Sequence, residues 1–256
     1  MISINYFQTI AMSFALLALT ATGCSNTASE NVTTQGIHAD FRVIAEGNGT
    51  TLVRAELAVG SNGIGQTLLD LSPGDSLTVI ANGIQQTMIK NTSIIGDIEY
   101  VTRFSFDDAN TLFVIALNRT NGTSAPNSSV RLPDGFNVLS PASSTVYSTG
   151  QTIGIVWAPS GTSITPSVSV TLECRLLSGL PTLNLRIISL SSDTGAASIP
   201  VSSIMPVGTL DTSRLCEGTV YFERIRHGSL DRNYGEGGRI TGEQYEEGRF
   251  FVDPAQ

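Results

Sequence analysis

The feature that most constrains the fold of this chain is an alternation of apolar and polar residues with a period of two. It is clearest in residues 37–45, 53–59 and 98–106, where nearly every second side chain is apolar. Successive side chains of a β-strand point to opposite faces, so this period is typical of strands with one buried face. Four Asn-Gly dipeptides add turn signals, because both residues tolerate the positive φ of tight hairpins. No segment combines a helical stripe with a cap, and the sequence predicts an all-β fold.

Two groups of strand-like segments follow one another along the chain. The first lies in residues 37–119, and the apolar run 111–117 within it is typical of a central strand. The second lies in residues 136–256, with strands expected at 152–157, 167–174, 183–190, 219–226 and 239–252, the last with a turn inside. Between the two groups, residues 120–135 are rich in Ser, Asn, Pro and Gly, which indicates a linker. We therefore expect two β-sandwich domains in series.

The first residues carry an export signal. Residues 10–19 are apolar but too few to span a bilayer as a helix, and they lead into Ala21-Thr22-Gly23-Cys24. An apolar core followed by small residues predicts that residues 1–23 are a signal peptide. Small residues directly before a cysteine resemble the bacterial lipobox, in which Cys24 would be acylated and become the first residue of the mature protein. The alternative is a plain secretory peptide with an incidental cysteine. Residues 24–36, which are polar after Cys24, are expected to form a short disordered tether.

The cysteine count agrees with lipidation. Three cysteines are an odd number for an exported chain, and one of them needs a separate explanation. If Cys24 carries lipid, Cys174 and Cys216 remain and are expected to form a disulfide in an oxidising compartment. That bond would close a loop of about 43 residues and contribute about 4 kcal/mol. The alternative is two separate buried thiols.

Composition argues against several kinds of function. The formal net charge of −8 argues against a nucleic-acid partner. A serine hydrolase needs a base beside its nucleophile, but the chain has only His38 and His227, and no Gly-x-Ser-x-Gly motif. The same two histidines, with two cysteines expected to be oxidised, make no zinc ligand set. We therefore expect no catalytic activity, no metal and no cofactor.

Three groups of side chains are candidates for ligand contact. Asp231, Asn233 and Glu236 place oxygen ligands close together as calcium loops do, although the spacing excludes an EF-hand. Trp157 is the sole tryptophan and ends a predicted strand, where it either packs in the core or stacks on a carbohydrate. Arg224 and Arg226 share one strand face, which is either a solvated edge or an anion-binding face.

Two stretches resemble known families. The segment NVLSPASSTVYSTGQTIGIVWAP, with Ser140-Pro141, Gly150 and Trp157, is similar to the start of the Ig-like domain in Ser/Thr-rich yeast cell-wall proteins of the glucan-biosynthesis type. Through SAPNSSVRLP and GEGGRITGEQ, the whole chain also resembles uncharacterised bacterial surface lipoproteins. The first resemblance implies that the second sandwich is Ig-like, and we expect an Ig-like fold for the first sandwich as well. Neither resemblance implies a catalytic residue.

The sequence thus predicts a lipid-anchored binding module of the cell envelope. Its partner is expected to be a protein or an envelope glycan, and its contact with the membrane is expected to run through the lipid alone. A serine directly after the cysteine, as at Ser25, resembles the pattern of lipoproteins that are sorted to the outer membrane. The sequence leaves the oligomeric state open. Two alternatives remain, a structural or accessory subunit of an envelope assembly and a hydrolase of unrecognised type. An assembly subunit would show a long, exposed, hydrophobic strand edge.

Overall fold

The computed structural model describes residues 26–60, 67–93, 96–161 and 164–256 of the chain. The predicted signal peptide (1–23) and Cys24 lie outside these residues. The strands are β1 (Asn26–Ala28), β2 (Ile37–Ala45), β3 (Thr51–Val59), β4 (Thr67–Asp70), β5 (Ser76–Ala81), β6 (Ile84–Thr87), β7 (Ile89–Thr92), β8 (Ile98–Phe104), β9 (Leu112–Asn118), β10 (Ala125–Arg131), β11 (Val138–Ser140), β12 (Val146–Ser148), β13 (Thr152–Trp157), β14 (Ser167–Arg175), β15 (Pro181–Ile188), β16 (Ala196–Pro200), β17 (Cys216–His227) and β18 (Gly238–Asp253). The helical turns are η1 (Ser29–Asn31), η2 (Thr34–Gly36) and η3 (Val201–Ser203). In the described part of the chain, no helix has the length and hydrophobicity needed to cross a membrane. The predicted all-β fold is confirmed.

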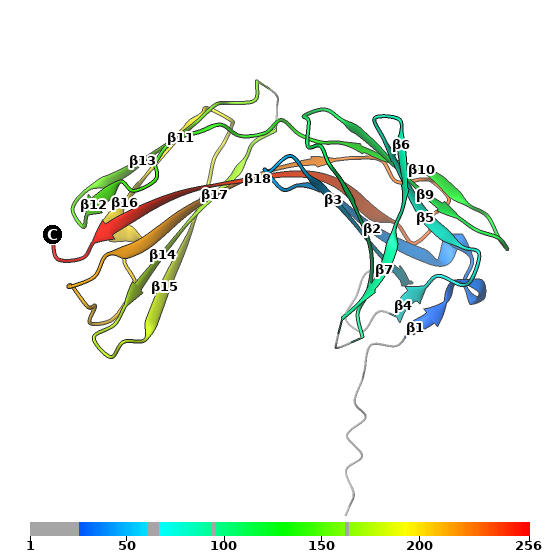
Figure 1. Cartoon of the computed structure of the whole chain (residues 1–256), viewed down its shortest axis with the longest axis horizontal. Helices are drawn as coiled ribbons and strands as arrows, with labels where there is room; N and C mark the ends of the chain where they lie inside the picture. The colour runs from blue at the N-terminus through cyan, green and yellow to red at the C-terminus, as the bar shows by residue number, and fades with distance from the viewer. Residues whose placement is uncertain (1–25, 61–66, 94–95, 162–163) are drawn as a thin grey trace, which may run out of the picture.

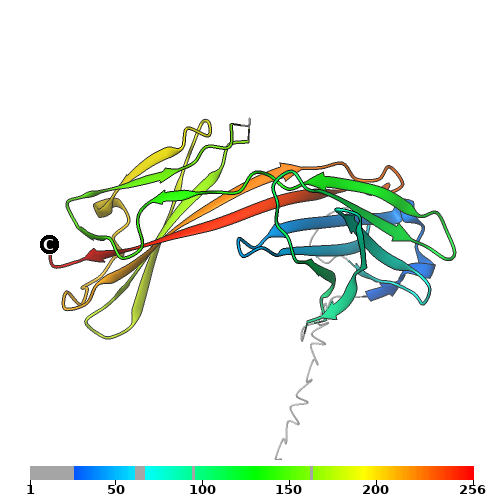
Figure 2. The ribbon, with the colours of Figure 1, turned by 45° about the horizontal axis from the view of Figure 1, so that its top comes forward.

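Three sheets build two lobes that together form an arch (Figure 1). Sheet A has 11 strands, ordered β1-β4-β3-β2-β18-β17-β14-β15 with β7, β8 and β12 attached, and it runs through both lobes. Sheet B (β10-β9-β5-β6) completes the first lobe, and sheet C (β11-β13-β16) completes the second. The two long strands β17 and β18 bridge the lobes, as the turned view of Figure 2 shows most clearly.

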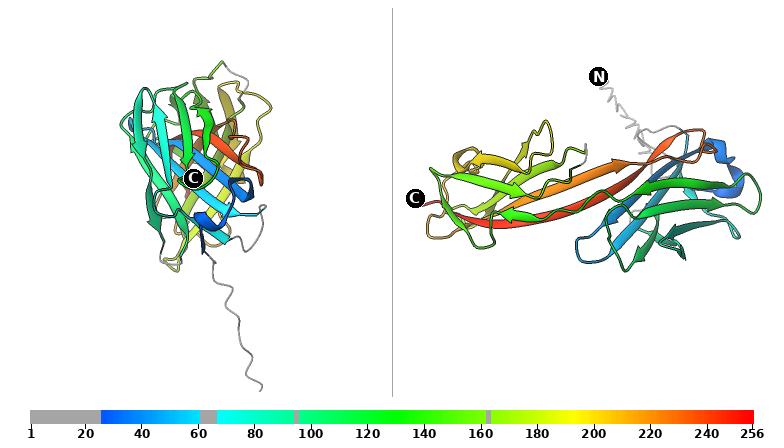
Figure 3. Two further views of the ribbon diagram at one scale, coloured as in Figure 1. Left: turned by 90° about the vertical axis from the view of Figure 1, so that its right-hand side faces the viewer. Right: turned by 90° about the horizontal axis from the view of Figure 1, so that it is seen from above.

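Sheets B and C cover the same face of sheet A. On β18, Ile240 is buried in the first core, whereas Phe250 and Val252 are buried in the second. These residues are an even number apart on one continuous strand, so their side chains point to the same face. The opposite face of sheet A is therefore left uncovered by either small sheet. It lines the inner side of the arch, which we call the concave face (Figure 1). Seen from above, β17 and β18 run from one lobe into the other (Figure 3).

The second core contains the predicted disulfide. Cys174 on β14 and Cys216 on β17 are bonded, and both are buried among the residues of the second lobe. They lie on neighbouring antiparallel strands, one step beyond the paired residues Glu173 and Glu217. The prediction of this bond is confirmed.

The predicted linker at residues 120–135 is wrong. Ala125–Arg131 forms β10, which pairs with β9 in sheet B. Ala125, Val130 and Leu132 are buried in the first core, and Ser128 is buried beside them. The segment looked like a linker because its outward-facing residues are polar and its inward-facing residues are small.

The predicted disordered tether is also wrong for the residues that the structure describes. β1 pairs in parallel with β4, and Ser29 and Thr34 are buried. Arg119, whose side chain is 2% exposed, donates hydrogen bonds to the carbonyls of Ser29 and Val32 and forms an ion pair with Asp75. A polar segment folds here because the body supplies a buried arginine that binds its backbone carbonyls.

The last predicted strand does not turn. β18 is one strand of 16 residues. Its first part pairs with β2 in parallel, so Gly238 lies opposite Ala39 and Gln244 opposite Ala45. The first lobe is therefore not confined to residues 37–119, and the two lobes are not simple halves of the sequence. Gly242 within β18 allows a close approach of two backbones, since a Cβ there would lie 2.6 Å from the backbone oxygen of Arg131.

Candidate functional site

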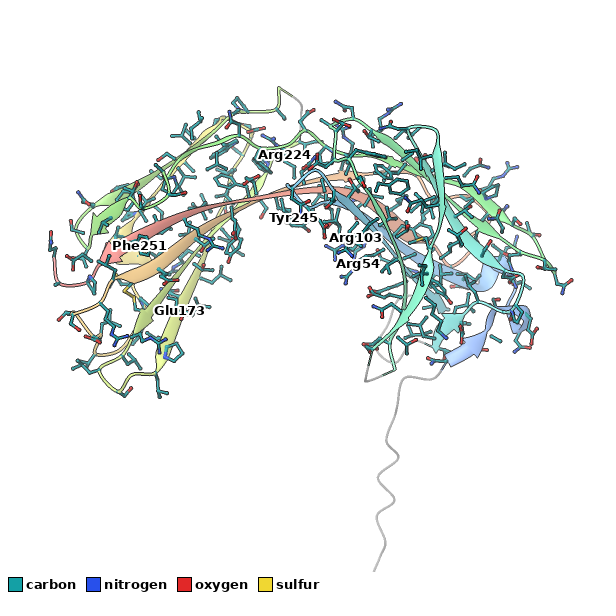
Figure 4. The ribbon with its side chains drawn as sticks, in the orientation of Figure 1. Arg54, Arg103, Glu173, Arg224, Tyr245 and Phe251 are labelled. Carbon is teal, nitrogen blue, oxygen red and sulfur yellow. A yellow bond between two sulfur atoms is a disulfide. The ribbon has the colours of Figure 1, made fainter. Side chains whose placement is uncertain are left out.

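The concave face is the candidate functional surface, because it is one continuous sheet face that spans both lobes. It is formed by the side chains that alternate with core residues on the strands of sheet A. In Figure 4, Tyr245, Arg103 and Arg54 lie on the underside of the arch, whereas Arg224 lies above β17 and β18. The main contributors are Leu183, Leu185 and Ile187 of β15, Glu173 of β14, Tyr221 and Glu223 of β17, Glu243, Tyr245, Glu247 and Arg249 of β18, Arg42 of β2, Arg54 of β3 and Arg103 of β8.

An ion pair between the buried Glu243 and the partly exposed Arg42 holds the middle of this face. Arg42 donates to both carboxylate oxygens of Glu243, at 2.9 Å and 2.6 Å. Glu243 also accepts hydrogen bonds from the Thr241 hydroxyl at 2.8 Å and the Tyr245 hydroxyl at 2.6 Å. Burial alone would raise the pKa of the Glu243 carboxyl, but these bonds together hold that pKa below its usual value. The carboxylate is therefore charged at neutral pH, and it fixes the arginine and the tyrosine.

The same network fixes the phenol of Tyr245. Burial, and after it the hydrogen bonds to Glu243 and Glu223, raise the pKa of Tyr245 far above its usual value. The phenol stays protonated at physiological pH and donates to Glu243. Its ring is thereby held in one orientation between the two lobes.

A groove lies beside Tyr245, where the ladder of sheet A is interrupted. β2 pairs with β18 as far as Gln244, and β12 begins to pair with it only at Phe251. Within the described part of the chain, no strand pairs with β18 on this side in between. The cavity there measures about 360 Å³ and is lined by Glu46, Gly47, Tyr221, Phe222, Tyr245, Glu246 and Glu247. We call it the junction groove.

The outer strand of sheet A carries a second unusual feature. β15 is the last strand of the sheet, and its concave-face side chains are all aliphatic. Leu183, Leu185 and Ile187 are 62%, 54% and 72% exposed, respectively. Apolar side chains arranged along an open edge are unusual in a monomeric protein, because such edges invite pairing with another strand.

The structure decides between the two interpretations of Trp157. Trp157 is fully buried, and its ring packs edge-on against Phe222 at 5.6 Å between centroids. Its indole N–H donates to a carboxylate oxygen of Asp193 at 2.7 Å. The core interpretation is therefore right, and the Trp157 ring is not exposed for stacking on a carbohydrate.

Arg224 and Arg226 share one face of β17 as expected, but both interpretations of that face, as a solvated edge or an anion-binding face, are wrong. Both belong to the side of β17 that carries Val220 and Phe222, and this side faces the cores. Arg224 is fully buried, and its guanidinium lies 2.7 Å from a carboxylate oxygen of Asp193 and 4.0 Å from the Phe136 ring centroid.

Arg224 also donates hydrogen bonds to backbone carbonyls. These acceptors belong to Asp134 and Gly135, which connect the lobes, and to Ala158 of the second lobe. Arg226 bonds the Asn110 side chain and the Leu132 carbonyl. Arg224 links the two lobes, whereas Arg226 bonds residues of the first lobe, and these contacts leave the pair engaged inside the protein instead of forming an anion-binding face.

Asp193 is the buried partner of both Trp157 and Arg224. Burial would raise the pKa of its carboxyl, yet the Ser160 backbone N–H, the Trp157 indole and Arg224 together lower that pKa. The Asp193 carboxylate is therefore charged at neutral pH and accepts hydrogen bonds on both oxygens, a condition under which a buried ion pair supports a fold.

The calcium candidates are engaged in structural contacts. One carboxylate oxygen of Asp231 accepts the backbone N–H of Asn127 on β10, and the other accepts that of Asn233. The Asn233 side chain donates to the Ser124 carbonyl, while Glu236 is exposed and gives only its backbone oxygen to His38. Across the described residues, no group of three or more His, Cys, Asp or Glu side chains is placed to hold a metal ion. The loop therefore attaches residues 231–233 to sheet B.

Comparisons with known proteins give only distant structural likeness. No family model and no curated protein sequence matches the chain. Fibronectin(III)-like modules of Clostridium thermocellum CbhA share 10% identity over 85% of this chain and 90% of theirs, with a TM-score of 0.26. Titin domains I67–I69 share 7% over 84% and 65%, with a TM-score of 0.24. A Bacteroides ovatus protein, SGBP-B, solved with a mixed-linkage heptasaccharide, shares 12% over 91% and 67%, with a TM-score of 0.18. At TM-scores this low, the three structures carry no argument about this chain.

Proposed function

We propose that this protein is a non-catalytic binding module of the bacterial cell envelope that takes an elongated protein partner across its concave face. The observation that carries this proposal is the continuity of sheet A, which presents aromatic, aliphatic and charged side chains of both lobes on one surface. Exposed Tyr and Arg residues on a rigid surface are typical of protein interfaces. A partner that contacts both lobes suits this surface best.

Rigidity at the junction supports the proposal. The Arg224–Asp193 ion pair and the unbroken β17–β18 ladder keep the two halves of the concave face in register. A preorganised surface loses little conformational entropy on binding. The same contacts therefore give a higher affinity than they would between a partner and two flexibly linked domains.

The anchor is the second part of the proposal. A lipid on Cys24 would place the first lobe against the bilayer, because β1 begins at Asn26 with a single residue in between. The outer membrane is the location that Ser25 favours. The experiment is the substitution Cys24→Ser, which is expected to release the protein from membranes in soluble form. Retention in the membrane fraction after a high-salt wash would contradict the lipid anchor.

A glycan is the second candidate ligand, and the junction groove favours it. Tyr221 and Tyr245 present aromatic rings at its wall, and Glu46, Glu246 and Glu247 surround them with hydrogen-bond acceptors. Sugar rings bind through such combinations of flat apolar surface and polar groups. This candidate would use the same side of the arch but only its centre.

The test uses a photoreactive phenylalanine analogue at Tyr221 in intact cells. The protein-partner proposal expects a discrete adduct from this position and none from Val207, which is 94% exposed and lies outside sheet A. If the ligand is a glycan, Tyr221 gives no protein adduct. Purified envelope polysaccharide would then retard the protein in affinity electrophoresis, and the substitution Tyr221→Ala would abolish the shift. Identical adducts from both positions would contradict a specific concave-face site.

A further inference from the structure

β15 is the one long and unguarded edge strand among the described residues. Other edge strands are short: β1 and β11 have 3 residues each, β6 has 4 and β16 has 5. The edge strand β10 has 7 residues, but its register shifts between Ala125 and Ser128, and Ser129 is bridged to Ser229. β15 has 8 residues and pairs with β14 in unbroken register. It contains no lysine, and its one charged side chain, Arg186, lies on the opposite face from Leu185 and donates to the Ser203 carbonyl. Natural proteins usually shorten, bend or charge an edge that is to stay unpaired.

The backbone groups that β15 leaves unpaired can be assigned from two independent features. The backbone N–H of Leu176 donates to the carbonyl of Leu180 at 2.9 Å, which marks a hydrogen-bonded position in the turn between β14 and β15. Hydrogen-bonded and non-hydrogen-bonded positions alternate along an antiparallel pair. Counting from Leu176, the residues of β15 bonded to β14 are Thr182, Asn184, Arg186 and Ile188.

The disulfide gives the same assignment from the other side of β14. The Cα atoms of Cys174 and Cys216 are 4.4 Å apart, the spacing of a non-hydrogen-bonded pair. Cys174 therefore turns its backbone groups away from β17 and toward Thr182 of β15. It follows that Leu183, Leu185 and Ile187 point their N–H and C=O groups outward, and their exposed side chains lie on the concave face beside these groups.

We propose that β15 pairs antiparallel with β15 of a second copy of this chain. The twofold axis that relates the two copies lies midway between their Leu185 residues. In this register Leu185 meets its own copy, and Leu183 lies opposite Ile187. Each of these residues offers an outward N–H and C=O, so every pair can exchange two hydrogen bonds. The aliphatic side chains then form a self-complementary row on the concave face, as a twofold interface requires.

The side chains on the opposite face of β15 select this register. Pairing about Leu185 places Asn184 opposite Arg186 and Thr182 opposite Ile188, so no like charges meet. Pairing about Arg186 would set two guanidinium groups directly against each other, which is destabilising. Pairing about Asn184 would place Pro181, which has no N–H to donate, opposite Ile187. Of these three registers, only the Leu185 register avoids both conflicts.

Disulfide trapping tests the register directly. In the exported chain carrying Cys24→Ser, Cys174 and Cys216 are bonded to each other, so an added cysteine is the only free thiol. Leu185→Cys is expected to form an intermolecular disulfide on mild oxidation, because the two Cα atoms would be about 5.5 Å apart. Leu183→Cys alone would place its two copies about 14 Å apart and should not react, whereas a mixture of Leu183→Cys with Ile187→Cys should.

Analytical ultracentrifugation provides a second measurement that needs no oxidation. The chain with unaltered β15 is expected to sediment as a dimer at high concentration, Leu185→Lys as a monomer, and the control Val207→Lys as a dimer. A monomer at every concentration would overturn the proposal. Equal cross-linking by Leu183→Cys, Leu185→Cys and the control Val207→Cys would overturn it as well, because random collisions would then explain the adducts.

Discussion

At the scale of single residues, the unusual feature is a fully buried arginine between two lobes. The guanidinium of Arg224 neutralises Asp193 and binds three backbone carbonyls, so one side chain satisfies acceptors from three distant segments. Replacing a buried ion pair as a whole can be neutral, but removing one partner leaves an uncompensated charge. This asymmetry gives Arg224 its importance for the junction.

The substitution Arg224→Met should therefore destabilise the protein by about 3–5 kcal/mol, since the Asp193 carboxylate would stay buried without its cation. The matched control is Arg249→Met, which breaks the exposed pair with Glu247 and should cost less than about 1 kcal/mol. Urea unfolding of both variants measures the difference. Equal effects would mean that Asp193 finds another partner.

The lowered pKa of Asp193 makes a prediction about acid. A carboxyl whose pKa is lower in the folded than in the unfolded state stabilises the fold above its ordinary pKa of about 3.9. This stabilisation is lost as the pH falls from the pKa of the unfolded state to below the lower pKa that Asp193 has in the folded state. The substitution Asp193→Asn should lower stability at neutral pH and flatten its decline between about pH 5 and pH 2.

The fluorescence of Trp157, the only tryptophan, reports the transition directly beside this carboxyl. Asp108→Asn is the control, because Asp108 is exposed and its substitution removes one carboxylate without touching the cluster. An unchanged acid profile in Asp193→Asn would show that other carboxylates govern acid unfolding.

The sequence predicts the alternation of side chains in β17 correctly but not which of its two faces is exposed. The two arginines suggest that the face with Val220 and Phe222 is open to solvent or to an anion, whereas that face packs on the core. The same alternation places Tyr221 on the opposite, exposed face of β17, so this residue could be predicted from the sequence. The Arg224–Asp193 pair could not be predicted, because no local pattern relates two residues that meet only after the lobes have packed.

At the scale of elements, β17 and β18 fit together through a glycine. Gly218 lies opposite Phe250 in the ladder, and a Cβ added to it would lie 2.2 Å from the Phe250 ring. The ring covers the bare backbone, a known way of stabilising a glycine within a strand. The absence of a side chain at this position is what allows the aromatic ring to lie flat in the second core.

We expect Gly218→Ala to destabilise the protein by about 1–3 kcal/mol, because the ring must leave its position. Gly154 on β13 is the control, since an added Cβ meets nothing within 4 Å, and Gly154→Ala should be neutral or slightly stabilising. Thermal unfolding of the two variants provides the comparison. A tolerated Gly218→Ala would mean that the core adjusts around the methyl group.

Strands could be predicted from the sequence where their signal lay within the strand itself or in an adjacent turn. β2, β3 and the β5–β6 hairpin lie where the alternation and Asn82-Gly83 placed them, and both turn residues have the expected positive φ, 48° and 76°. β1 and β10 were missed because composition averages over the two faces of a strand. The parallel pairing of β2 with β18 was also beyond reach, since alternation gives the face of a strand but never its neighbour.

At the scale of the whole molecule, the arch behaves as one body. Residues 120–135 carry β10 and the carbonyls that Arg224 binds, so they should resist a protease in the native protein. Limited proteolysis followed by mass spectrometry is expected to find no early cleavage there. Early cuts in this segment, with two fragments that each stay folded, would restore the picture of independent domains.

The parallel pairing of β2 with β18 also sets the order in which the protein can be completed. Ala39 is made early, yet its ladder partner Gly238 emerges about 200 residues later, a delay of about 10–40 s at typical rates of synthesis. Through that interval β2 lacks one of its two neighbours, and the first lobe lacks Ile240 from its core. The nascent chain thus stays incomplete until almost the whole of it has been synthesised. The export proposed above would place this last pairing on the far side of the membrane.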